Sequence, residues 1–84
     1  ELNDWGYRLL HSGRPRDGLE IMKLVVALFP RSGNAEDSLG EAYAINGDIR
    51  QSIVHYRRSL ALDPANTHAT QQIERLEKKS SAEN

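Results

Sequence analysis

The segment from Asp37 to Pro64 reads DSLGEAYAINGDIRQSIVHYRRSLALDP and has the pattern of two helices that pack together. Gly40 and Ser52 are small, so two helices can approach each other closely at these positions. Pro64 cannot continue a helix interior and therefore ends the second helix. We expect three larger side chains to fill the space between the helices, namely Leu39, Tyr43 and Tyr56. The segment predicts a helical hairpin.

The same pattern occurs a second time earlier in the chain, with every matched position displaced by the same number of residues. The matched positions are Pro30 with Pro64, Gly6 with Gly40, Gly13 with Gly47, Trp5 with Leu39, Leu9 with Tyr43, Gly18 with Ser52 and Met22 with Tyr56. A fixed period of about 34 residues indicates an array of repeated helical hairpins. Two unrelated hairpins of similar length would need both glycines and both prolines to coincide.

On these residues the chain, over about 1–79, resembles the tetratricopeptide-repeat family. The first copy departs from the family pattern, since Leu9 and Met22 replace the usual aromatic residues and Gly18 the usual alanine. The resemblance implies an all-α fold of two tetratricopeptide helical hairpins and a C-terminal capping helix, which together form a fragment of an α-solenoid. The expected parts are repeat one (1–32), repeat two (33–66), the capping helix (67–79) and a flexible tail (80–84).

The chain also looks like the repeat module at the C-terminal end of some bacterial secreted or envelope hydrolases. Two stretches carry this second likeness, Leu2–Leu10 and Asp37–Asp48. It implies that the module packs on, or recruits a partner for, an enzyme domain lying upstream. Because the chain begins at Glu1 without a methionine, we expect it to be part of a longer protein.

Apolar spacing and capping residues predict five helices. The first runs from about Leu2 to His11, with Leu2, Trp5, Gly6 and Leu9 on one face. The second starts at Pro15 and ends near Phe29, and the third is capped by Asn34. Asp48 caps the fourth helix, which carries Ile49, Ile53, Tyr56 and Leu60 inward. Asn66 caps the fifth, whose apolar stripe is Ala69, Ile73 and Leu76; a repeat array needs such a cap to cover its last hairpin.

Composition excludes several classes of function. With 11 basic and 12 acidic residues the formal net charge is −1, which argues against a general nucleic-acid binder. The chain has no cysteine, so it cannot form a disulfide or a thiolate metal site. Its longest apolar run, Leu24–Phe29, is far too short to cross a membrane. We therefore expect no nucleic acid and no membrane among its partners, and its cellular compartment is not determined.

Residues that could support catalysis or metal binding are scattered. His11, His55 and His68 fall on three different predicted helices and show no metal-binding spacing with each other or with a carboxylate. No serine lies in a nucleophile-elbow motif, and the turn from Arg31 to Asn34 is not a phosphate-binding loop. We therefore predict a protein that is not an enzyme, with no metal and no cofactor.

The resemblance implies a concave groove that binds an extended or helical peptide. The groove positions of the family correspond here to Asn3, Tyr7, Leu10, His11, Asn34, Asp37, Glu41, Ala44, Ile45, His68, Gln71 and Arg75. Asp37 and Glu41 are four residues apart, which places both carboxylates on one helix face and favours a partner with a basic residue. The alternative is a solvated acidic face. One subclass of the family binds a C-terminal carboxylate with a clamp of cations and asparagines, and its positions correspond here to Asn3 and Tyr7, then Ser38, then His68 and Gln72. None of them supplies the required cation or the paired asparagine, so we expect no such clamp.

The second predicted helix is apolar over a wide arc. Met22, Val25, Val26 and Phe29 are expected to pack within the hairpin, and Ile21, Leu24 and Leu28 form a second stripe rotated from the first. If the hairpin does not bury this second stripe, it is an oligomer interface. The prediction is thus a scaffold for protein–protein interaction; the alternative is a structural module that forms a homodimer or packs on an upstream hydrolase domain.

Overall fold

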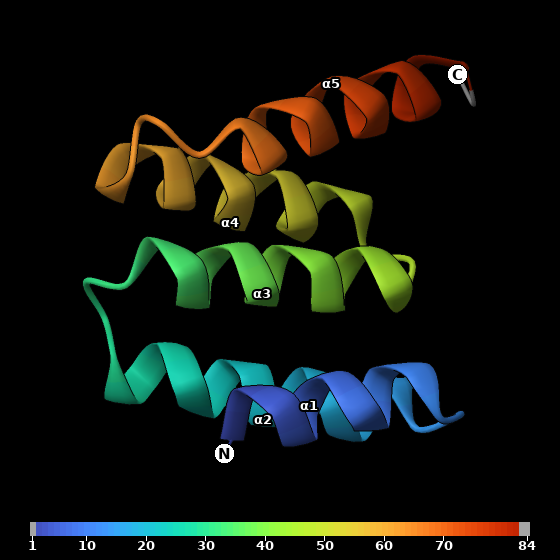
Figure 1. The fold of residues 1–84 in the computed structure, drawn as a ribbon. Helices are drawn as coiled ribbons and strands as arrows, with labels where there is room; N and C mark the ends of the chain where they lie inside the picture. Colours follow the sequence, from blue (N-terminus) through green and yellow to red (C-terminus); the bar gives the residue numbers. More distant parts are fainter. Residues whose placement is uncertain (1, 83–84) are drawn as a thin grey trace.

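The computed structural model describes residues 2–82, and within this range the chain forms five α-helices and no strand. The helices are α1 (Leu2–His11), α2 (Pro15–Leu28), α3 (Gly33–Ile45), α4 (Ile49–Leu62) and α5 (Thr67–Ala82). Successive helices run in opposite directions and lie side by side in the order of the sequence (Figure 1). The all-α prediction is confirmed. In space α3 packs against α4, α2 and α1, and α5 packs against α4.

The turns inside the two helix pairs have the same backbone geometry. Gly13 and Gly47, at matched positions of the two pairs, both adopt positive φ angles, of 85° and 84°. This left-handed conformation favours glycine over residues with a Cβ atom. The starts of the following helices also agree with the sequence, since Pro15 occupies the first turn of α2 and Asp48 Oδ1 accepts a hydrogen bond from the Gln51 amide at 3.1 Å.

Two predicted helix boundaries are wrong. Ser32, rather than Asn34, caps α3, because its Oγ accepts a hydrogen bond from the Ala35 amide at 3.0 Å. Asn34 lies inside the first turn of the helix. The capping helix does not end at Lys79 but continues to Ala82, so the part of the expected tail at 80–82 is helical. The rest of that tail, 83–84, lies outside the described residues.

Small residues bring the helices of each pair together at matched positions. A Cβ atom on Gly18 would lie 2.8 Å from the carbonyl oxygen of Gly6, so α1 and α2 meet there without room for a side chain. At the matched position in the second pair, Ser52 Oγ donates a hydrogen bond to the carbonyl oxygen of Gly40 at 2.6 Å. Because Ser52 is fully buried, this bond also satisfies its hydroxyl group.

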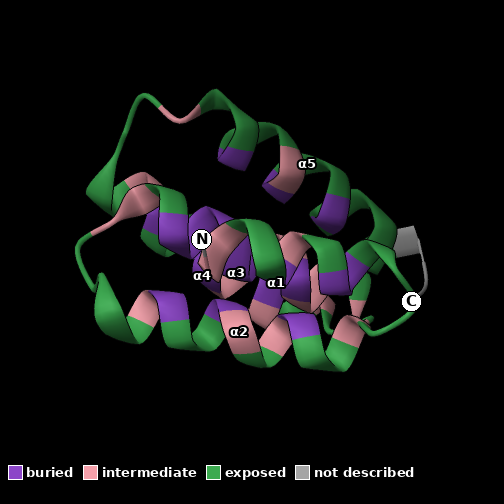
Figure 2. Ribbon diagram, turned by 60° about the horizontal axis from the view of Figure 1, so that its bottom comes forward, coloured by how far each residue is buried: buried purple, intermediate pink, exposed green. Residues whose placement is uncertain are grey.

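The apolar core consists of two clusters. The first contains Leu10, Met22, Leu39 and Ala42 and ties α3 to α1 and α2. Leu39, expected inside the second hairpin, thus helps to join the two helix pairs. The buried sides of the helices face inward in Figure 2.

The second cluster lies between α4 and α5. Its buried members are Tyr56, Ala69, Ile73 and Leu76, with Ile49, Ile53 and Leu60 packed against them. The predicted inward face of the fourth helix and the predicted apolar stripe of the fifth are confirmed.

Some apolar residues expected in the interior are exposed. Trp5 and Phe29 expose 51% and 59% of their surface, so the predicted inward faces of α1 and α2 are only partly buried. Ile21, predicted in the second stripe of α2, is half-buried. A Cβ atom placed on Gly6 would lie 3.2 Å from the Cγ2 atom of Ile21. Leu24 and Leu28 are exposed, at 44% and 54%. The exposed part of the second stripe of α2 therefore consists of Leu24 and Leu28.

Candidate interaction groove

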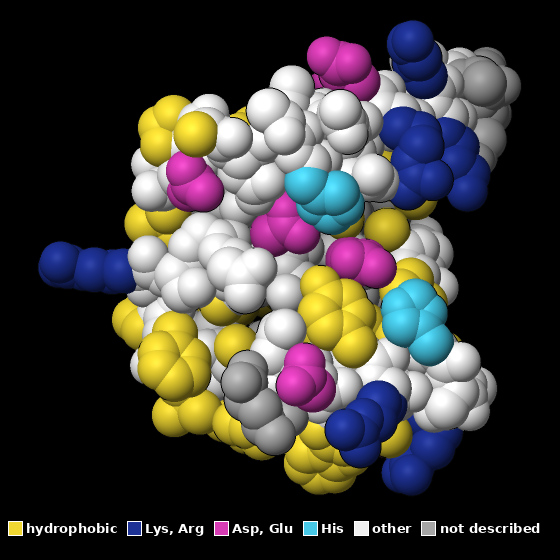
Figure 3. Space-filling view, in the orientation of Figure 1, with side chains coloured by type: hydrophobic (Ala, Val, Ile, Leu, Met, Phe, Trp, Pro, Cys, Tyr) yellow, Lys and Arg dark blue, Asp and Glu magenta, His cyan; other side chains and the backbone are white. Residues whose placement is uncertain are grey.

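A pocket of about 380 Å³ opens between α3 and α5, on the face that Figure 3 shows. It is lined by His11 of α1, by Glu41, Ala44 and Ile45 of α3, by Ile49 and Tyr56 of α4, and by His68, Gln72, Arg75, Leu76 and Lys79 of α5. Six of the twelve predicted groove residues are among these, namely His11, Glu41, Ala44, Ile45, His68 and Arg75. We call this pocket, with the acidic residues beside it, the groove.

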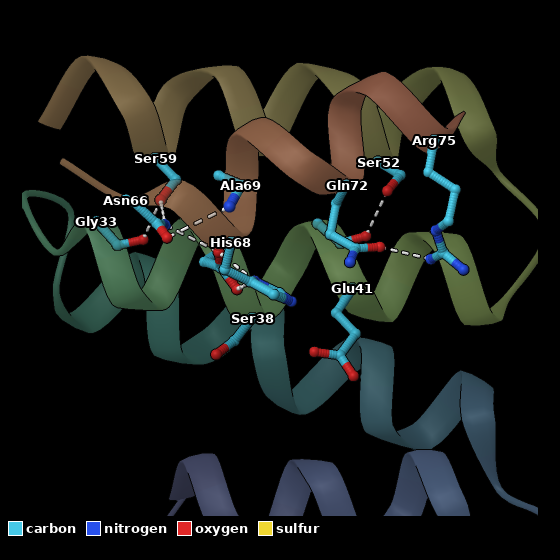
Figure 4. A network of polar contacts seen from close by, with 12 residues as sticks. Gly33, Ser38, Glu41, Ser52, Ser59, Asn66, His68, Ala69, Gln72 and Arg75 are labelled. Carbon is cyan, nitrogen blue, oxygen red and sulfur yellow. Dashed lines mark hydrogen bonds and ion pairs between the residues drawn. The ribbon is translucent and has the colours of Figure 1, made fainter. Parts of the chain in front are cut away.

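The acidic side of the groove is built on α3. Asp37 is buried, and its carboxylate accepts a hydrogen bond from Asn66 Nδ2 at 2.9 Å and from His68 Nδ1 at 2.9–3.0 Å. Asn66 also accepts a hydrogen bond from the Ala69 amide through its Oδ1, as expected for the cap of α5. Asp37 therefore connects α3 to the start of α5, and this network is drawn in Figure 4.

Glu41 lies one helical turn beyond Asp37 and is half-buried. The hydroxyl group of Tyr7, from α1, lies 3.0 Å from Ser38 Oγ and 3.3 Å from Glu41 Oε1. The predicted residues of α1 and α3 thus meet directly on this side. The alternative of a fully solvated acidic face does not describe Asp37, which is buried.

Burial, together with this negative charge, raises the pKa of two tyrosine hydroxyl groups. Burial raises the pKa of Tyr7 to about 12, and the nearby carboxylates of Glu41 and Asp37 contribute in the same direction. Burial also raises the pKa of Tyr56, again with contributions from Asp37 and Glu41. Both hydroxyl groups are neutral at physiological pH, and in this form the hydroxyl group of Tyr7 makes its hydrogen bonds to Ser38 and Glu41.

Asp37, Glu41 and His68 could in principle ligate a metal ion, since one ligand atom from each lies within 4.8 Å of the others. Both oxygens of Asp37, however, already accept hydrogen bonds from Asn66 and His68. A metal ion would have to displace these bonds, which hold α5 on α3. We assign no metal to the cluster.

The other predicted groove residues lie elsewhere. Leu10 is buried in the first core cluster and is not available to a partner, so its placement in the groove is wrong. Asn3 and Asn34 border a second, mostly apolar pocket of about 310 Å³ beside Phe29 and Leu28. Gln71 is exposed on α5.

Sequence reasoning missed Gln72 and Lys79, which line the groove. Together with His68 and Arg75 they follow the spacing four, three, four along α5, so helical periodicity could have placed all four on one face. It also missed the buried pair behind the groove, in which His55 Nδ1 donates a hydrogen bond to Glu36 Oε1 at 2.7 Å. These two residues lie on different helices, and no local spacing relates them.

No family model matches the chain, and no curated protein matches it either. Within residues 2–82 none of the helices combines the length and the apolar character that crossing a bilayer requires.

Proposed function

We propose that the chain is a tetratricopeptide-type module for protein–protein interaction, without catalytic activity, and that its groove binds a peptide segment of a partner protein. The observation that carries this proposal is the groove itself, where six of the twelve residues at the groove positions implied by the family resemblance, from α1, α3 and α5, lie around one opening. The constant repeat period and the matched turns at Gly13 and Gly47 support the repeat assignment.

The chemistry of the groove suits a peptide. Ala44 and Ile45 supply apolar surface for a side chain, and Glu41 supplies a carboxylate for a basic residue. We therefore propose a partner that carries a lysine or an arginine.

The test is a selection of binders from a random peptide library, with the wild-type chain as bait. In the variant Ala44→Arg a long side chain fills the groove, so the selected peptides should bind it at least about tenfold more weakly. Ala61→Arg is the matched control, because Ala61 is exposed on α4 and does not line the groove. Circular dichroism checks that both variants remain helical.

Binding that is equal in wild type and Ala44→Arg would contradict the proposal. So would a library from which the wild type enriches no peptide.

The exposed Leu24 and Leu28 favour a second candidate function, that of a structural module. In this case α2 forms a homodimer contact or packs on an upstream hydrolase domain, and the groove binds nothing. An exposed apolar stripe on a helix surface is typical of such contacts. Sedimentation equilibrium of the wild type and of Leu24→Glu separates the two candidates.

A further inference from the structure

The groove carries opposite charges on its two walls. Glu41 lies on α3, whereas Arg75 and Lys79 lie on α5. Figure 4 shows Glu41 on α3, and Gln72 and Arg75 next to each other on α5. In Figure 3 a group of Lys and Arg side chains lies over the C-terminal part of α5, away from the acidic and histidine side chains at the centre of the face.

These charges are not neutralised within the part of the chain that the structure describes. Arg75 donates a hydrogen bond to the neutral Gln72 Oε1, and neither Arg75 nor Lys79 forms an ion pair with a described carboxylate. Glu41 has the Tyr7 hydroxyl group beside it and no ion pair with a described basic residue. Elsewhere on α5, by contrast, Glu77 is paired with Arg57 at 2.6 Å.

A ligand with charges of one sign cannot satisfy both walls. An acidic peptide would meet Arg75 and Lys79 favourably but would be repelled by Glu41 and by the buried Asp37 carboxylate. A basic peptide would be attracted by Glu41 but repelled by Arg75 and Lys79. Because like charges brought together across an interface cost free energy, each wall selects against one class of peptide.

We propose that the groove recognises a peptide segment of mixed charge. A basic side chain lies at Glu41, an apolar side chain on Ala44 and Ile45, and an acidic side chain at Arg75 and Lys79. This inference rests on the proposed function and deepens it, since it states which peptides the groove accepts. The order of the charges along the peptide depends on the direction in which the peptide lies.

The test uses the same random peptide library with three baits in a buffer that contains EDTA. The wild type should enrich peptides in which an apolar residue has a basic residue on one side and an acidic residue on the other. Glu41→Lys makes both walls basic and should enrich peptides with acidic residues on both sides. The double variant Arg75→Glu, Lys79→Glu makes both walls acidic and should enrich peptides with basic residues on both sides.

Matched controls change the same charges outside the groove. Glu74→Lys and Lys78→Glu alter exposed positions of α5 that do not line the groove, and their selections should match that of the wild type. Glu41→Gln keeps the size of the side chain and should lose only the preference for a basic residue. A selected mixed-charge peptide should bind Glu41→Lys about tenfold more weakly than it binds the wild type.

The outcomes separate this inference from the proposed function. If Ala44→Arg abolishes binding but the charge composition of the enriched peptides is the same for all baits, the mixed-charge inference is overturned and the groove function stands. If no bait enriches peptides, both are overturned. If Glu41→Lys instead changes the mass of the protein in sedimentation, the groove holds a second copy of the chain, which also overturns the inference.

Discussion

Gly40 lies where α3 packs closely against the aromatic ring of Tyr56 on α4. A Cβ atom at this position would lie 3.0 Å from three ring atoms of Tyr56, which is itself almost fully buried. The backbone of Gly40 also accepts the hydrogen bond from Ser52 Oγ. The lack of a side chain at Gly40 is therefore what this contact requires.

We predict that Gly40→Leu destabilises the fold by about 1–3 kcal/mol. The leucine side chain must displace the ring of Tyr56, and this cost exceeds the gain of up to about 1 kcal/mol from the better helix propensity of leucine. Urea unfolding followed by circular dichroism measures the free energy of unfolding. Ala61→Leu, at an exposed position of α4, is the control and should change it little. An increase in stability for Gly40→Leu would contradict the close approach.

At the scale of an element, α5 covers the last helix pair through one narrow stripe. Ala69, Ile73 and Leu76 pack around Tyr56 of α4, while most other side chains of α5 are exposed. The start of the helix is held separately by polar bonds, from Asn66 and His68 to Asp37. Apolar packing and the polar network therefore act on different parts of the same element.

We predict that deletion of residues 67–84 leads to aggregation, or to a loss of helical content beyond the removed helix. The deletion uncovers Tyr56 and the apolar residues around it on α4, and a repeat array needs a polar outer face to remain soluble. Size-exclusion chromatography and circular dichroism measure the two effects.

A shorter deletion, of residues 80–84, is the control, because it leaves Ala69, Ile73 and Leu76 in place. The melting temperature of this variant should be close to that of the full chain. A 67–84 deletion that stays monomeric and melts at an unchanged temperature would show that α5 is not a cap.

At the scale of the whole molecule, the two ends of the helix array differ. Leu39 is 3% exposed, because Leu10 and Met22 of the first helix pair cover it. Trp5, at the matching position of the first helix pair, is 51% exposed. Leu24 and Leu28 of α2 are exposed as well. Apolar surface is therefore left open on the α1–α2 side, whereas α5 covers the apolar side of α4.

If the second candidate function is correct, Leu24→Glu should abolish self-association and keep the helical content. Leu24 is 44% exposed, so a charge there does not have to be buried in the folded monomer, but it would be buried in a symmetric contact between two copies. Sedimentation equilibrium of wild type and variant over a wide concentration range measures the mass.

The control is Ala61→Glu, a change at an exposed position of α4 that does not belong to the stripe. A wild type that stays monomeric at all concentrations rules out the homodimer. A Leu24→Glu variant that unfolds would place Leu24 in the core of the helix pair.

Local signals in the sequence predicted most of the helices and turns. The bounds of α1, the first turn of α2 and the caps Asp48 and Asn66 follow from apolar spacing and from hydrogen bonds between near neighbours in the chain. Such features depend on adjacent residues, and this is why the sequence is sufficient for them. Ser32 was missed as the cap of α3 because Asn34, two residues later, is an equally good capping residue by type alone.

The groove needed more than local signals. Spacing placed Asp37 and Glu41 on one helix face, but it could not show that Asn66 and His68, 29 and 31 residues away, would bury Asp37. For the same reason Leu10, which was expected in the groove, is buried, and Trp5, which was expected on an inward face, is exposed. Burial depends on which helix lies opposite. The sequence by itself determined where most of the helices begin, turn and end, because those choices are made between near neighbours. Only the tertiary structure decided which faces are covered and which charges are left unpaired, because both depend on contacts between helices far apart in the chain.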